Sequence, residues 1–173
     1  MRGRLKVGHG TLNPSMKVRF LPPQHFLRYN INMKKGTDYI GVAIGAIVFN
    51  NKGEIFLSRR SQNTKNEKGH WETPGGSVEF GETLEQAAKR EILEEYGAEI
   101  EIIEQWPASD HLIPDEKQHW VSTTFLAKFK LGQEPKIMEP EKCDEIGWFN
   151  LNVLPTPLSI ITKLNLEQYY KKH

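Results

Sequence analysis

Three glutamates, Glu91, Glu94 and Glu95, lie within about one helical turn of the segment GGSVEFGETLEQAAKREILEEYGA. At about 100° per residue, Glu91 and Glu95 fall on the same side of a helix as the apolar Leu84. The acidic cluster therefore borders, and partly replaces, the stripe that should face the core. Like charges three or four residues apart repel one another, and more strongly in a low-dielectric cleft. The spacing predicts a positively charged group against this face.

Charge is distributed unevenly along the 173 residues, whose formal net charge is +1. Residues 1–35 contain eight Lys or Arg and no acidic side chain, so residues 36–173 hold 15 basic against 22 acidic side chains. An acidic domain is a poor counterion for a nucleic-acid backbone, and we do not expect a nucleic-acid partner. If this domain handles phosphates, a divalent cation is the expected intermediary.

A domain boundary is expected near residue 35. Residues 1–35 lack sustained periodicity and are predicted to form a basic, weakly structured N-terminal extension. Three interpretations of this extension stay open: a transit peptide, sequence upstream of a translation start at Met33, or a tail that packs on the domain. Residues 36–173 are long enough for one compact domain with its own core.

Cysteine content and hydropathy indicate the compartment. Cys143 is the single cysteine, which excludes an intrachain disulfide, and we interpret it as a passive residue. The longest apolar run, IGVAIGAIVF at residues 40–49, is too short to cross a bilayer. We therefore predict a cytoplasmic protein with no membrane partner.

Local patterns place the glutamates on a helix beside a sheet. An NNKG turn at 50–53 is predicted to close a hairpin, and Thr83 with Gln86 forms a capping box for a helix that ends at Gly97. Hairpins mixed with helices, rather than strict βαβ repeats, predict an α/β fold with a mixed sheet between helices. The expected strands are 39–49, 54–60, 99–106, 119–130 and 145–149, and a second helix is expected over 158–170.

The glycines and charges of residues 75–98 together resemble the Nudix box, G-x5-E-x7-R-E-U-x-E-E-x-G-U, in which U is a bulky aliphatic residue. The last position is Ala98, smaller than usual, which we interpret as a packing variation. The resemblance extends over residues 39–170 and implies a Nudix hydrolase of the MutT type, an α/β/α sandwich with a mixed β-sheet between helices. The matching positions are Gly76, Glu82, Arg90, Glu91, Ile92, Glu94, Glu95 and Gly97.

The resemblance implies a metal site and a catalytic base. Glu91, Glu94 and Glu95, helped by the carbonyl of Gly75, would ligate Mg²⁺ or Mn²⁺, hard cations that suit carboxylate and phosphate oxygens. One glutamate would orient or deprotonate the attacking water. Glu91 is one candidate for that base, and a residue of the later acidic loop, for which we choose Glu141, is the other.

The resemblance also implies supporting and substrate-binding residues. Arg90 would pair with Glu82 or with the glutamate that follows it, and so fix their conformations. Gly76 would let the backbone approach a ligand closely. Arg59 and Arg60 end a strand in the motif FLSRR and would reach substrate phosphate or sugar, for which guanidinium geometry is well suited.

Aromatic residues outside the box are candidates for stacking on a base, although aromatic residues on strands are more often part of the core. His119 begins a strand and is expected to be structural rather than catalytic. The stacking candidates are Trp71, Trp106, Trp120, Trp148 and Phe149.

The expected activity is Mg²⁺-dependent hydrolysis of a nucleoside diphosphate linked to another moiety. A (deoxy)nucleoside triphosphate, cleaved to monophosphate and pyrophosphate, is the leading substrate, and a nucleotide sugar or ADP-ribose-type molecule is the alternative. A non-catalytic nucleotide-binding module is the competing class. Residues 155–159 (PTPLS) hold no Asn or Asp placed as in members selective for oxidised guanine. A homodimer is carried only as an analogy with the family.

Overall fold

The computed structural model describes residues 33–173. Most of the predicted N-terminal extension, residues 1–32, lies outside the described residues. Its last part, however, contacts the domain: Lys35 bridges to Tyr39, and its ammonium group donates a hydrogen bond to the carbonyl of Val78 at 3.2 Å. Among the described residues, no helix is long and apolar enough to cross a membrane.

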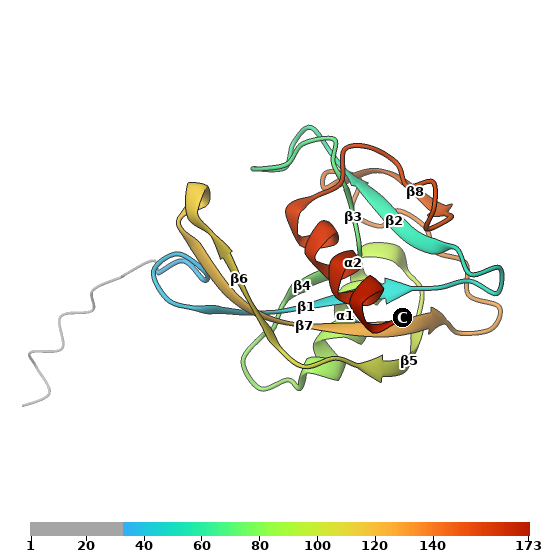
Figure 1. Cartoon of the computed structure of the whole chain (residues 1–173), viewed down its shortest axis with the longest axis horizontal. Helices are drawn as coiled ribbons and strands as arrows, with labels where there is room; N and C mark the ends of the chain where they lie inside the picture. The colour runs from blue at the N-terminus through green and yellow to red at the C-terminus, as the bar shows by residue number, and fades with distance from the viewer. Residues whose placement is uncertain (1–32) are drawn as a thin grey trace, which may run out of the picture. The chain divides into compact units, whose positions relative to one another are not determined.

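Two sheets and two helices make up the described chain (Figure 1). The larger sheet has the order β4-β1-β7-β5, and β6 pairs with the other end of β7. The smaller sheet has the order β3-β2-β8. The larger sheet contains β1 (Gly41–Val48), β4 (Gly75–Ser77), β5 (Ile100–Gln105), β6 (Ser109–Ile113) and β7 (Gln118–Phe129). The remaining elements are β2 (Ile55–Arg60), β3 (Trp71–Glu72), β8 (Cys143–Phe149), the short 3₁₀ helix η2 (Pro114–Glu116), α1 (Leu84–Tyr96) and α2 (Ile160–Lys172).

The larger sheet is mixed and lies between the helices, as predicted. Strands β1 and β7 pair in parallel, whereas their pairings with β4, β5 and β6 are antiparallel. Side chains alternate along β1, so Ile44 and Ala46 pack with α1 while Ile47 packs with Leu166 of α2. Figure 1 shows α2 in front of the sheet and α1 behind it. The predicted α/β class and sandwich are therefore confirmed.

The predicted hairpin between the first two strands forms only at its turn. The NNKG turn does reverse the chain, and Phe49 bridges to Ile55, but β2 then joins the smaller sheet between β3 and β8. The reason lies in the side chains of β2, which are apolar on both faces. Phe56 packs in the cluster around α1, whereas Ile55 and Leu57 pack in the cluster around α2. A separate sheet buries both faces of this strand.

Helix α1 begins and ends where the sequence predicts. The Thr83 hydroxyl accepts a hydrogen bond from the Gln86 amide, and the Gln86 side chain accepts one from the Thr83 amide. Gly97 ends the helix in the left-handed conformation, with φ of 62°. Ile92 and Tyr96 lie in the core together with the alanines of the second turn. This burial fixes the rotation of the helix and leaves its glutamates at the border of the core.

Helix α2 is anchored by a buried polar network rather than by an apolar stripe alone. The Asn165 side chain donates to the Thr73 hydroxyl at 3.1 Å and accepts from the Thr124 hydroxyl at 3.0 Å. Thr162 accepts from the Thr73 backbone amide at 2.8 Å and from the Ser159 hydroxyl at 2.9 Å. Because each buried side-chain polar atom among the described residues has a partner, this network holds α2 firmly beside β3 and β4.

Strand β6, absent from the predicted elements, forms a hairpin with the first half of β7. The turn is the 3₁₀ helix η2, which ends at Lys117 in the left-handed conformation. Figure 1 shows this hairpin reaching past the rest of the sheet. The segment SDHLI has too few apolar positions for its alternation to be read in the sequence.

Candidate active site

The paired glycines of β4 allow the strand to contact both β1 and α1. A Cβ atom on Gly76 would come within 2.2 Å of Cδ of Glu91, and one on Gly75 within 2.5 Å of the Ile44 carbonyl oxygen. Real Cβ atoms do not make such contacts, so only glycine allows this arrangement. The Glu91 carboxylate therefore lies directly against the backbone of β4.

Arg90 binds three carboxylates and one carbonyl. Its Nε and Nη2 atoms donate to the two oxygens of Glu82 at 3.0 and 2.7 Å, and Nη2 also reaches the carbonyl of Ser77 at 3.2 Å. Nη1 lies 3.0 Å from a carboxylate oxygen of Glu91 and 3.0 Å from one of Glu94. This planar, bidentate geometry is specific to arginine. The proposed pairing of Arg90 thus involves both Glu82 and Glu91.

The arginine stabilises the ionised form of Glu82. Its hydrogen bonds, with a further one from the Glu79 amide, lower the pKa of Glu82 to about 2. The same contacts raise the pKa of Arg90. The pair therefore stays charged at all ordinary pH values, and its role is to orient the helix carboxylates.

Among residues 33–173, Glu95 forms no ion pair, and Glu91 shares the Nη1 atom of Arg90 with Glu94. Burial raises the pKa of Glu91 in spite of Arg90. Burial, reinforced by the charges of Glu91 and Glu72, raises the pKa of Glu95 to about 8. These raised pKa values have two causes, the burial of the carboxylates and the repulsion between neighbouring negative charges. A cation bound between these carboxylates would relieve the repulsion that the sequence led us to expect.

The donor atoms suit a divalent cation, although the side chains are not gathered around one point. Within residues 33–173, no group of three or more His, Cys, Asp or Glu side chains is arranged to hold an ion. Glu94 is 56% exposed and turned to Arg90, whereas Glu91 is 16% exposed. Two partly buried carboxylates with raised pKa values, plus the exposed Glu94, form a donor set of the hard oxygen type.

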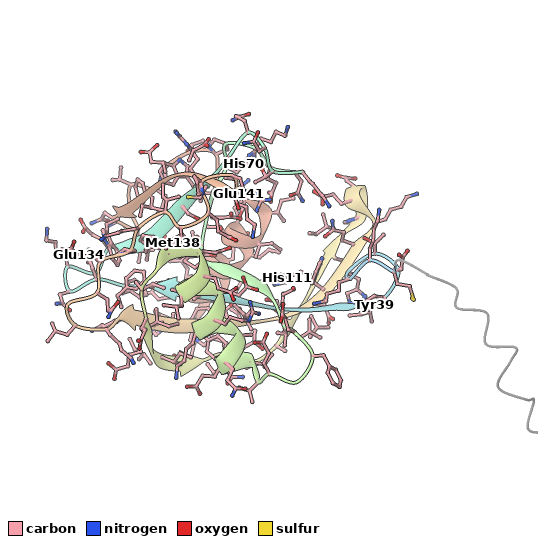
Figure 2. All side chains as sticks on the ribbon, turned by 180° about the vertical axis from the view of Figure 1, so that it is seen from behind. Tyr39, His70, His111, Glu134, Met138 and Glu141 are labelled. Atoms are coloured by element: carbon pink, nitrogen blue, oxygen red, sulfur yellow. The ribbon has the colours of Figure 1, made fainter. Side chains whose placement is uncertain are left out.

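The acidic loop after β7 brings a different residue to the cluster from the one predicted. Glu139 contributes to the raised pKa of Glu95, and Lys142, which donates to Glu139 at 2.7 Å, is close enough to lower that of Glu91. Glu141 is exposed, and its backbone carbonyl accepts a hydrogen bond from Ser61 (Figure 2). The base role of Glu141 stays a prediction, and Glu139 becomes the better-placed member of this loop.

The two predicted arginines of β2 lie in different environments. Arg60 lines the cleft, donates to Glu72 at 2.7 Å and contacts Asn66. Arg59 pairs instead with Glu145 of β8 at 3.0 Å and lies over the ring of Trp71. Glu72, which the sequence did not single out, binds Arg60, and its negative charge helps to raise the pKa of Glu95 on α1. A substrate-binding role is now better supported for Arg60 than for Arg59.

A cleft of ≈ 270 Å³ opens beside Gly75 and Gly76. It extends from Glu72 to the β6–β7 hairpin and is bounded on the other side by the start of α2. Of the stacking candidates, Trp120 lines this cleft. The other four belong to the core or pack against it: Trp71, Trp106, Trp148 and Phe149. The His119 ring donates a hydrogen bond from Nε2 to the Asp110 carboxylate at 3.3 Å, and its structural role stays a prediction.

This combination of fold, glycine pair and charged helix defines a family. The NUDIX domain family matches residues 40–169, and the chain belongs to it. Its members are hydrolases of phosphoric anhydride bonds that generally use divalent metal ions. Among solved structures, a MutT NUDIX hydrolase from Burkholderia pseudomallei is 37% identical, with a TM-score of 0.68, and the match covers 75% of this chain and 98% of that one.

Curated relatives carry names that refer to RNA. An RNA pyrophosphohydrolase of Wolbachia pipientis is 34% identical over 102 residues, covering 50% of this chain and 60% of the relative. A NAD-capped RNA hydrolase, NudC, of Citrobacter koseri is 30% identical over 112 residues, covering 60% of this chain and 39% of the relative. The chain thus matches less than two thirds of the length of either relative.

Proposed function

We propose that this chain is a Mg²⁺- or Mn²⁺-dependent pyrophosphohydrolase that cleaves a diphosphate bond in a nucleotide. The observation that carries the proposal is the α1 assembly, in which Arg90 holds Glu82, Glu91 and Glu94, and the Glu91 carboxylate lies against Gly76, a residue that lines the cleft. Burial raises the pKa values of Glu91 and Glu95, so a bound cation would stabilise their ionised forms. Membership of the NUDIX domain family supports the same chemistry.

Carboxylates of α1 would bind the metal ion, and one carboxylate would accept the proton of the attacking water. Glu91, Glu94, Glu95 and the Gly75 carbonyl would hold the metal ion, which lowers the pKa of bound water and neutralises phosphate charge. Water attacks one phosphorus, the bridging P–O bond breaks, and the released proton passes to a carboxylate and then to solvent. A carboxylate with a raised pKa is suited to accept this proton, which favours Glu91.

A (deoxy)nucleoside triphosphate, converted to monophosphate and pyrophosphate, is the substrate we favour. Arg60 lines the cleft, and its guanidinium would bind a substrate phosphate after its hydrogen bond to Glu72 is broken. The names of two relatives make the 5′-triphosphate or the NAD cap of an RNA a second candidate. Both candidates contain a nucleoside joined to a diphosphate, so the same cleft serves either.

The test is a substrate panel with Mg²⁺, analysed by product chromatography with and without a chelator. It includes normal and oxidised nucleoside triphosphates, nucleotide sugars, ADP-ribose, NAD and a 5′-triphosphorylated oligoribonucleotide. Monophosphate and pyrophosphate from a free triphosphate, lost on chelation, are expected. Cleavage confined to the oligonucleotide would select the second candidate. No chelator-sensitive product from any member, with the protein folded, would leave only the non-catalytic binding module.

A further inference from the structure

Trp120 is placed unlike the other three tryptophans of the chain. Trp71 and Trp106 are 7% and 1% exposed and lie in the core around α2, and Trp148 packs against the core around α1. The ring of Trp120 is only partly buried and lines the cleft at its β6–β7 end. Core packing does not explain why the ring of Trp120 stays partly exposed inside this cleft.

The ring of Trp120 is held in one orientation. A Cβ atom on Gly36 would lie 2.4 Å from the ring, and one on Gly41 would lie 2.3 Å from it, so the backbone of two glycines contacts the indole. The indole N–H donates to the Gln118 side chain at 2.8 Å. Because Gly36, Gly41 and Gln118 all contact the ring, its orientation is fixed before any ligand binds, which lowers the entropy cost of binding.

His111 lies next to Trp120 and has a spare ring nitrogen. The two residues are register partners on β6 and β7 (His111 is labelled in Figure 2), and both line the cleft. His111 is 5% exposed, and its Nε2 meets the Ser109 hydroxyl at 3.1 Å. No residue within 33–173 hydrogen-bonds to its Nδ1. Burial lowers the pKa of His111, so the ring is neutral near pH 7 and offers one donor and one acceptor.

The same cleft connects this end with the proposed phosphate end. In the sheet, Gly41 is opposite Trp120 and Gly45 is opposite Gly75, so the two ends are four residues apart along β1. At about 3.3 Å per residue this is roughly 13 Å, a span suited to the sugar and phosphates of a nucleotide. Asn66 lines the facing wall and is tied to the hairpin by its hydrogen bond to Glu116 at 2.8 Å.

We propose that the β6–β7 end of the cleft binds the aromatic base of a nucleotide, which stacks on Trp120 and hydrogen-bonds to His111. The inference rests on the proposed function, because it assumes that the phosphates lie at Gly75 and Gly76. It adds that recognition depends on the base and not on phosphate alone. Trp120 and His111 are then residues that determine specificity, and they take no part in breaking the bond.

Binding without catalysis gives the first test. Chelator is added, and tryptophan fluorescence is titrated with nucleoside 5′-monophosphates and, separately, with ribose 5-phosphate. Stacking is expected to quench the fluorescence only with the nucleotides. Trp120→Leu, which lacks the reporting ring and is therefore titrated by calorimetry beside the wild type, should bind them roughly 10- to 100-fold more weakly. Trp120→Phe, which keeps a ring, should retain most of the affinity. Leu112→Ala, an exposed neighbour on β6, serves as the matched control.

Turnover gives the second test and separates the two proposals. Trp120→Leu should raise KM for the preferred nucleotide with little change in kcat, and should leave cleavage of a base-free analogue, ribose 5-triphosphate, unchanged. If Trp120→Leu and His111→Ala bind and cleave the nucleotide like the wild type, the base site is overturned while the hydrolase stands. If the wild type cleaves the base-free analogue as efficiently as any nucleotide, both the base site and the nucleotide specificity are overturned.

Discussion

The two ends of the cleft are built from different kinds of sequence. At the proposed phosphate end, the carboxylates from Glu82 to Glu95 come from one stretch of fewer than twenty residues, and Glu82, Glu91 and Glu94 are held by ion pairs to Arg90. At the proposed base end, Trp120, His111 and Asn66 come from three segments; glycine backbone contacts hold Trp120, and a hydrogen bond to the Glu116 carboxylate holds Asn66. The carboxylates proposed for bond cleavage are thus close together in the sequence, whereas the residues proposed for base recognition are brought together by the tertiary fold.

Glycine provides the one feature that both ends share. Gly76 lets the Glu91 carboxylate lie against β4, and Gly41 lets the Trp120 ring lie against β1. In each case a missing Cβ places one functional side chain against a strand. The same device therefore positions a charge at one end and an apolar ring at the other, and substitutions at the two glycines should have separable effects.

The largest effect should come from removing a carboxylate at the phosphate end. Glu95→Gln keeps the shape of the side chain but removes its charge, and we expect kcat to fall by roughly 10²- to 10⁴-fold with a small change in KM. Glu85→Gln, on the exposed first turn of α1, is the matched control and should stay near wild type. Steady-state kinetics at saturating Mg²⁺ measure both. Full turnover by Glu95→Gln would remove the role assigned to this helix.

Alanine at each glycine should sharpen the contrast between the ends. Gly76→Ala forces the Glu91 carboxylate to move, because the new Cβ would lie 2.2 Å from Cδ, and should lower kcat by roughly 10- to 100-fold. Gly41→Ala pushes the Trp120 ring and should raise KM for the nucleotide by roughly 10-fold with kcat retained. Circular dichroism checks that both variants fold. Equal losses of kcat in both would show that the two ends do not act separately.

The sequence alone predicts the contacts within α1 better than the contacts that depend on strand pairing. Arg90 and Glu94 are four residues apart on α1, and this spacing fixes their contact without knowledge of the rest of the fold, while the capping residues fix where that helix begins. Arg59 and Arg60 are adjacent in sequence, yet one pairs with β8 and the other lines the cleft, which depends on how β2 pairs. Only the fold decides this.

The base end escaped prediction for a related reason. Strand β6 is short and polar, so nothing in its residues indicates that His111 would face Trp120. Trp120 itself was one of five aromatic candidates of equal standing, and the packing of the other four in the core singles it out. Glu139 and Glu141 are likewise close in the loop, and only the fold shows which of them is near Glu95.

A conservative change at Arg90 should give an intermediate loss confined to the phosphate end. Arg90→Lys keeps one positive charge, but a single ammonium group cannot bind Glu82 through two bonds and also reach Glu91 and Glu94. We expect kcat to fall by about 10-fold and nucleoside monophosphate binding to stay unchanged. Arg59→Lys, on the other face of β2, is the control. A loss of monophosphate binding in Arg90→Lys would mean that the two ends are coupled through α1.

The smallest effect concerns the stability of the metal-free protein between pH 5 and pH 8. Glu95 has a pKa of about 8 in the folded chain, against an ordinary value near 4.5 when unfolded, so over this range the folded state binds more protons than the unfolded state. The free energy of unfolding must then decrease as the pH rises, by at most about 1.4 kcal/mol per pH unit from this one group. Glu82 adds nothing here, because its lowered pKa changes stability only below about pH 4.5.

Urea unfolding at several pH values, with chelator, measures this slope for the wild type and for Glu95→Gln. The variant should show a flatter dependence, since an amide does not titrate. Adding Mg²⁺ should stabilise the wild type most at pH 8, where the carboxylates are ionised and repel one another in the absence of the cation. A slope that Glu95→Gln leaves unchanged would show that this glutamate does not carry the unbalanced charge, and would move the search for it to Glu72 and Glu91, whose pKa values are also raised.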